Sequence, residues 1–162
     1  MNFMKKQTAG SGITFVAFVL SIVAIIVYFV NIGSAGYFQN AAVPETVMYN
    51  VIGIVLLAVV LAVSQLSING ATGKVLTIVS DALRIGAPVL FIVALMKLVS
   101  SRVQGFAFIY FSNEEVLHEV QTAENMSSAH GTIANMVLLG VTAVVAMAAA
   151  FFSMKKVQKV QK

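Results

Sequence analysis

Long apolar runs without a charged side chain constrain this sequence more than any other feature. Three such runs cover residues 13–32, 48–68 and 131–154. Each is about as long as the helix of roughly 20 residues that crosses the ~30 Å hydrocarbon core of a bilayer. Only 10% of all residues are charged and 59% are hydrophobic, whereas about a quarter of the residues of a soluble domain are charged. The sequence therefore excludes a water-soluble domain and predicts an integral membrane protein.

A fourth apolar run, over residues 75–99, contains charged side chains. Lys74 and Lys97 bracket about 33 Å of helix at about 1.5 Å per residue, which is one span if Asp81 and Arg84 lie within it. We therefore predict an all-α integral membrane protein with a single domain, residues 1–162. Its four transmembrane helices are expected over residues 13–32, 48–68, 75–99 and 131–154.

The distribution of positive charge predicts the orientation of the spans, because Lys and Arg near the ends of spans are retained on the cytoplasmic side. Most of them fall on the side that carries both termini: Lys5, Lys6, Lys74, Lys155, Lys156, Lys159 and Lys162. Arg102 falls on the other side of the membrane, and the long side chain of Lys97 can extend to that side. We expect a multi-pass protein of the plasma membrane with both termini in the cytoplasm.

The connections between the spans differ in length. Residues 69–73 contain Gly70 and Gly73, which permit positive φ, and predict a tight cytoplasmic turn. Residues 33–47 contain Gly33, Gly36 and Pro44 and predict a loop on the outer side. The third connection, residues 100–130, is the only long one and also lies on the outer side.

This outer segment contains the signature of a short amphipathic helix. Ser112 and Glu115 match a capping box, in which the Ser112 hydroxyl accepts from the Glu115 N–H and the Glu115 carboxylate accepts from the Ser112 N–H. Val116 and Val120 are four residues apart and would share one apolar face, with the glutamates on the other face. We expect an extracellular helix over residues 113–124.

Aromatic residues precede that helix, over residues 105–111, and favour a strand or an interfacial aromatic belt. Packing at the membrane surface explains this composition. An alternative is a docking surface for another protein, since aromatic side chains anchor many interfaces. The residues of this candidate outer interaction surface are Phe106, Phe108, Tyr110, Phe111, Glu115, His118 and Glu119.

Asp81, Arg84 and Pro88 form a candidate polar site inside the third span. Asp81 and Arg84 are three residues apart and so share one helix face, within reach of an ion pair. Pro88 leaves the Arg84 carbonyl without its usual donor and predicts a kink there. An ionisable group in the middle of a bilayer costs at least about 2.5 kcal/mol. Either the site serves transport, a substrate or a partner subunit, or the helix tilts and both charges lie near the cytoplasmic headgroups.

Small residues recur at four-residue spacing, which lets helices approach closely. They predict helix-packing positions within the bundle or toward a partner helix, at Ala58, Ala62, Thr142, Ala146 and Ala150.

We find no pattern for catalysis, a cofactor or a metal ion, and we expect neither an enzyme nor nucleic-acid binding. We expect a non-catalytic accessory, assembly or scaffold subunit that acts in the lipid bilayer as a homo-oligomer or within a larger membrane-protein complex. The alternative is a small oligomeric transporter or channel centred on Asp81, Arg84 and Pro88.

Overall fold

The computed structural model describes residues 8–65 and 71–152, with only the backbone for residues 71–73. The described part is all-helical, without a strand. Its helices are α1 (Ala9–Gly33), α2 (Pro44–Gln65), α3 (Ala71–Phe111), α4 (Glu114–Val120) and α5 (Ala123–Ala150). By length and composition, α1, α2, α3 and α5 could each cross a membrane. The prediction of four long apolar helices is thus confirmed.

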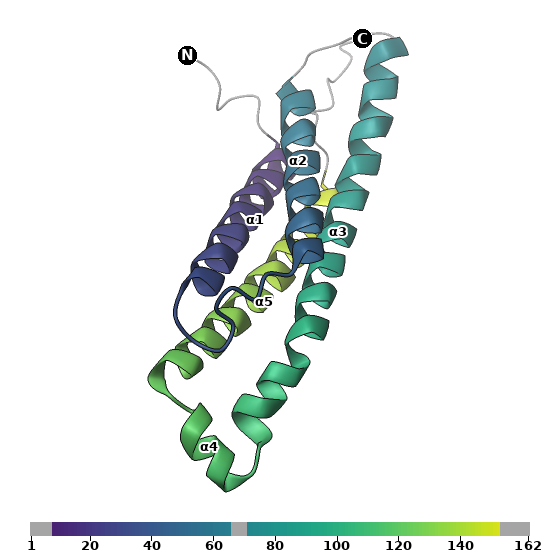
Figure 1. The fold of residues 1–162 in the computed structure, drawn as a ribbon. Coiled ribbons are helices and arrows are strands. Elements are labelled where there is room, and N and C mark those ends of the chain that lie inside the picture. The colour runs from purple at the N-terminus through teal and green to yellow at the C-terminus, as the bar shows by residue number, and fades with distance from the viewer. Residues whose placement is uncertain (1–7, 66–70, 153–162) are drawn as a thin grey trace, which may run out of the picture.

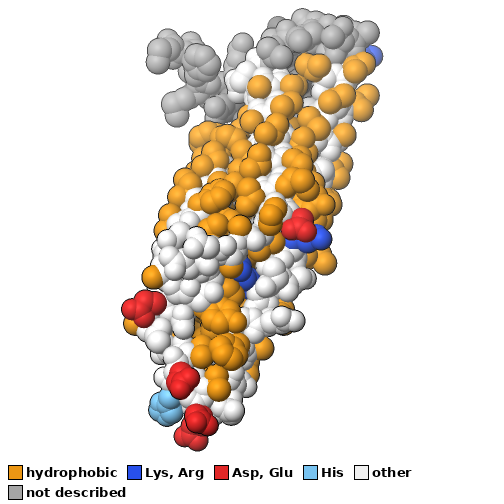
Figure 2. Space-filling view, viewed as in Figure 1, with side chains coloured by type: hydrophobic (Ala, Val, Ile, Leu, Met, Phe, Trp, Pro, Cys, Tyr) orange, Lys and Arg blue, Asp and Glu red, His pale blue; other side chains and the backbone are white. Residues whose placement is uncertain are grey.

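The long helices form an elongated bundle (Figure 1). α1 packs mainly on α5, α2 packs mainly on α3, and α3 joins the two pairs by also packing on α5. α4 lies at one end of the bundle, which we call the α4 end. Hydrophobic side chains cover most of the face seen in Figure 2, whereas acidic side chains gather toward the α4 end.

Small and polar side chains form the contact between α1 and α5, because they allow two helices to approach closely. The buried positions of α1 recur every three or four residues, as in Thr14, Ala17, Ser21 and Ala24. Two hydrogen bonds join the helices: Asn31 Nδ2 donates to Thr132 Oγ1 (2.8 Å), and Asn135 Nδ2 donates to the Ala24 carbonyl (2.5 Å).

The third helix is longer than the predicted span. α3 does not end at residue 99 but continues to Phe111, so residues 105–111 are helical and the prediction of a strand is wrong. Pro88 lies within α3, which continues on both sides of it. Residues 71–73 of the predicted 69–73 turn belong to α3, and residues 69 and 70 lie outside the described residues.

The predicted outer helix also has different bounds. α4 is shorter than 113–124 and begins one residue later, because the Asn113 side chain, and not that of Ser112, accepts from the Val116 N–H. The Ser112 hydroxyl instead donates to the Phe108 carbonyl (2.8 Å). Thr122 then caps a new helix, α5, which begins at Ala123 and not at residue 131.

The loop between α1 and α2, residues 34–43, folds against the α4 end of α3 and α5. Gly36 has φ of +131°, and a Cβ there would meet the Ser128 side chain at 2.6 Å. Phe38 is buried and packs with Ile109 and Ala129 in a small core at this end. This core, together with α4 and the neighbouring turns of α3 and α5, forms a unit that we call the cap.

Candidate functional site: the two buried arginines of α3

The buried face of α3 carries two arginines. Arg84 and Arg102 are each only 4% exposed. Eighteen residues are five turns of 3.6 residues, so both side chains lie on the same face of the helix. Arg84 lies about 27 Å along the helix from Arg102, at about 1.5 Å per residue.

Arg84 binds the end of α5. Its Nη2 donates to the Ala149 carbonyl and to the Phe152 carbonyl, the latter at 2.6 Å. α5 ends at Ala150, and the last carbonyls of a helix lack donors within the helix. A guanidinium at this position satisfies these carbonyls and also balances the negative end of the helix dipole. Arg84 therefore acts as a C-terminal capping residue that α3 supplies to α5.

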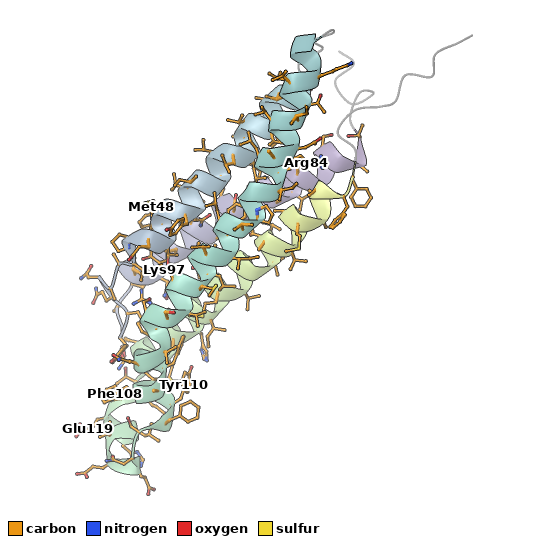
Figure 3. The ribbon with its side chains drawn as sticks, turned by 90° about the vertical axis from the view of Figure 1, so that its right-hand side faces the viewer. Met48, Arg84, Lys97, Phe108, Tyr110 and Glu119 are labelled. Carbon is orange, nitrogen blue, oxygen red and sulfur yellow. The ribbon has the colours of Figure 1, made fainter. Side chains whose placement is uncertain are left out.

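Asp81 completes this cluster. Its Oδ1 lies 3.3 Å from Arg84 Nη1, as the three-residue spacing predicts. The Asp81 side chain is 57% exposed, so the pair lies at the edge of the bundle and the carboxylate faces outward from the packed interior. Pro88 is buried one turn further along α3. Arg84 Nε is buried and has no hydrogen-bond partner within the described part of the chain. Figure 3 shows Arg84 between α3 and the end of α5.

Arg102 was not among the predicted site residues. Its Nη2 donates to the Ala41 carbonyl, and its Cζ lies 4.6 Å from the centroid of the Phe38 ring, a cation–π contact. The Phe38 N–H donates to Ser128 Oγ (3.1 Å), which ties the same loop to α5. A second anchor is Tyr28, whose hydroxyl accepts from the Val43 N–H (2.5 Å). Arg102 thus fixes the 34–43 loop as Arg84 fixes the end of α5.

The candidate outer interaction surface divides into a packed part and an exposed part. Phe106 packs edge-on against Phe38 at 5.5 Å between centroids and stacks with Tyr110 at 6.2 Å, so both are half-buried in the cap. Phe108 and Phe111 are 41% and 84% exposed. The α4 residues of that surface, Glu115, His118 and Glu119, are all exposed.

The predicted helix-packing positions also include both buried and exposed residues. On α5, Thr142 and Ala146 are buried and Ala150 is half-buried. On α2, Ala58 is half-buried and Ala62 is exposed, so α2 packs mainly through another face. That face consists of Thr46, Asn50, Gly53, Leu57 and Val60.

The arrangement around both arginines favours structural cohesion over chemistry. Arg84 binds two backbone carbonyls at the end of α5, and Arg102 binds one in the 34–43 loop, so each guanidinium holds a helix end or a loop in position. Within residues 8–65 and 71–152, no group of three or more His, Asp or Glu side chains is placed to hold a metal ion.

Comparisons with known proteins give no family for this chain: no family model, no curated protein and no solved structure matches it.

Proposed function

We propose that this protein is a non-catalytic accessory, assembly or scaffold subunit of the plasma membrane, which acts through helix–helix contacts and through its outer surface. The observation that carries the proposal is the position of Arg84. The one basic group in the middle of the third predicted span is bound to the end of α5 and to Asp81. A proton-coupled transporter needs a titratable group that two states of the protein expose differently. Releasing Arg84 would break its hydrogen bonds to the Ala149 and Phe152 carbonyls at the end of α5.

The charges along α3 support a membrane position that suits this role. Arg84 lies about 20 Å along the helix from Lys97. With Lys97 at the outer boundary, Arg84 falls about 10 Å from the inner boundary of a ~30 Å hydrocarbon core, and Asp81 lies closer to that boundary. In the sequence, Lys155 and Lys156 follow soon after Phe152, whose carbonyl binds Arg84. The pair then lies toward cytoplasmic headgroups, with both termini in the cytoplasm and the cap outside.

The cap supports action through contacts. It has its own small core and holds its loop through Arg102, so it presents a fixed surface. Exposed acidic and aromatic side chains lie on that surface. A fixed surface suits recognition because little conformational entropy is lost on binding.

Native mass spectrometry of the tagged protein, extracted in lipid particles from its own host, tests the proposal. We expect a complex with a different, larger membrane protein. A closed homo-oligomer without a partner would contradict the accessory role and favour a transporter, a channel or a self-assembling scaffold. In that case Asp81→Asn and Arg84→Gln should abolish a flux while leaving the oligomer intact.

A further inference from the structure

Three aromatic side chains remain exposed at the surface of the cap, and the packing of the chain does not use them fully. Tyr37 and Phe108 are each 41% exposed, and Phe111 is 84% exposed. The Tyr37 and Phe108 rings are in contact, with centroids 5.8 Å apart. Phe108 and Phe111 are three residues apart on α3 and so share a helix face. We call these three residues the aromatic edge.

Lipid does not account for the aromatic edge. Phe111 lies about 21 Å along α3 beyond Lys97, at about 1.5 Å per residue. The stretch from Lys74 to Lys97 already matches the thickness of a bilayer core. In Figure 3, Lys97 lies between Arg84 and the labelled residues Phe108 and Glu119, which lie at the far end. With Lys97 at the outer boundary, as proposed above, the aromatic edge lies beyond the hydrocarbon, where a cluster of exposed rings marks a site of interaction with another surface.

The charge around the aromatic edge is negative. Glu114, Glu115 and Glu119 on α4 are exposed, and α4 begins three residues after Phe111. None of these carboxylates has an ion-pair partner among the residues that the structure describes. The single Lys or Arg between residues 98 and 131 is Arg102, which is buried under the loop. We call the three glutamates the acidic rim.

The combination of aromatic edge and acidic rim selects the chemistry of a partner. A second copy of this chain would bring the same acidic rim, and anionic headgroups would add negative charge, so both are disfavoured by like-charge repulsion. A basic segment is instead attracted to this surface. Its Lys or Arg side chains can pair with the rim and also contact the faces of the exposed rings.

We propose that the aromatic edge and the acidic rim bind an extracytoplasmic segment, rich in Lys and Arg, of a different membrane protein. This inference rests on the proposed function and adds the chemistry of the partner and the surface that holds it.

Photocrosslinking from position 111 tests the inference in the full-length protein. Phe111 is replaced by p-benzoylphenylalanine, which is tolerated because the side chain is almost fully exposed. The protein is irradiated in membranes of its own host, and the crosslinked peptides are sequenced. We expect crosslinks to an outer segment with net positive charge. The crosslink yield should fall on the order of tenfold in the triple variant Glu114→Gln, Glu115→Gln, Glu119→Gln and at high salt, because paired surface charges accelerate association.

Glu45→Gln is the matched control, since Glu45 is exposed at the start of α2, outside the cap, and it should leave the yield unchanged. Crosslinks only to lipid, to a second copy or to a neutral or acidic segment would overturn the inference, as would a yield that does not respond to the triple variant. The two proposals fail separately. A heteromeric complex in the native mass measurement, combined with any of these crosslinking results, removes the inference and leaves the accessory role intact.

Discussion

At the residue scale, the arginines of α3 show how a mostly apolar chain can bury charge. Each guanidinium donates to backbone carbonyls: Arg84 to those of Ala149 and Phe152, and Arg102 to that of Ala41. Hydrogen bonds from a charged donor are stronger than neutral ones, and a buried carbonyl without a partner is costly. Charge at these positions is therefore compatible with a packed interior.

Arg84→Met should destabilise the bundle more than Asp81→Asn. The first change removes the donors to Ala149 and Phe152 and should lower the free energy of unfolding by about 1 to 3 kcal/mol. The second affects a carboxylate that is 57% exposed and should cost less than about 0.5 kcal/mol. Equilibrium unfolding in mixed micelles, followed by circular dichroism, measures both. Equal losses in the free energy of unfolding would show that the ion pair with Asp81, and not the hydrogen bonds to the end of α5, is the main interaction of Arg84.

The sequence predicts only part of this site. Three-residue spacing is sufficient to bring Asp81 and Arg84 together, because helix geometry is local. The partners on α5 are backbone carbonyls, which every residue has, so no side-chain pattern indicates which ones Arg84 will meet. The spacing of five full turns between Arg84 and Arg102 places both on one helix face and could have indicated that Arg102 is buried. That inference requires that one helix contains both residues.

At the element scale, the length of α3 determines the architecture. The helix runs from the bundle into the cap, so the same buried face serves the long apolar core and the small core around Phe38. The prediction ended the span near residue 99 because Lys74 and Lys97 bracket a helix long enough to cross a bilayer once. A polar residue marks the edge of a membrane, however, and does not by itself end a helix. The apolar runs of the other spans were predicted well because length and composition determine them directly.

Gly53→Ala should weaken the contact between α2 and α3. A Cβ at position 53 would lie 2.6 Å from Phe91 Cε1, and Phe91 is fully buried. We expect a loss of about 1 to 3 kcal/mol in the free energy of unfolding, as for other overpacked cores. Gly12→Ala is the control within α1, since nothing lies within 4 Å of its Cβ; it should be neutral or stabilise by up to about 1 kcal/mol. A neutral Gly53→Ala variant would mean that the helices are less closely packed here.

Arg102→Lys should loosen the 34–43 loop without unfolding the bundle. A lysine keeps the charge but loses the planar group that lies over Phe38 and binds the Ala41 carbonyl. Hydrogen–deuterium exchange at the Phe38 and Val43 amides should become about tenfold faster, equivalent to about 1.4 kcal/mol. Lys97→Met, at an exposed position of the same helix, should leave this exchange unchanged. Full protection in Arg102→Lys would assign the order of the loop to its other contacts.

At the scale of the whole molecule, the proposed orientation places the cap outside and the α2–α3 connection in the cytoplasm. The chain has no Cys, so single cysteines report on orientation directly. Glu119→Cys should react with a membrane-impermeant maleimide in intact cells, and Gln65→Cys only after permeabilisation. The opposite pattern would reverse the orientation that the lysines predict.

We propose a bundle whose interior is packed and held by Arg84 and whose function is carried by outward contacts. Reaction of interior cysteines with a small, water-soluble thiol reagent in native membranes tests this claim most directly. Ala94 on α3 and Ala146 on α5 are both buried in the core. We predict that Ala94→Cys and Ala146→Cys remain unmodified over the time in which Glu119→Cys reacts completely. Modification at either interior position at a comparable rate would reveal an aqueous path through the bundle and would contradict the account in favour of a transporter or channel.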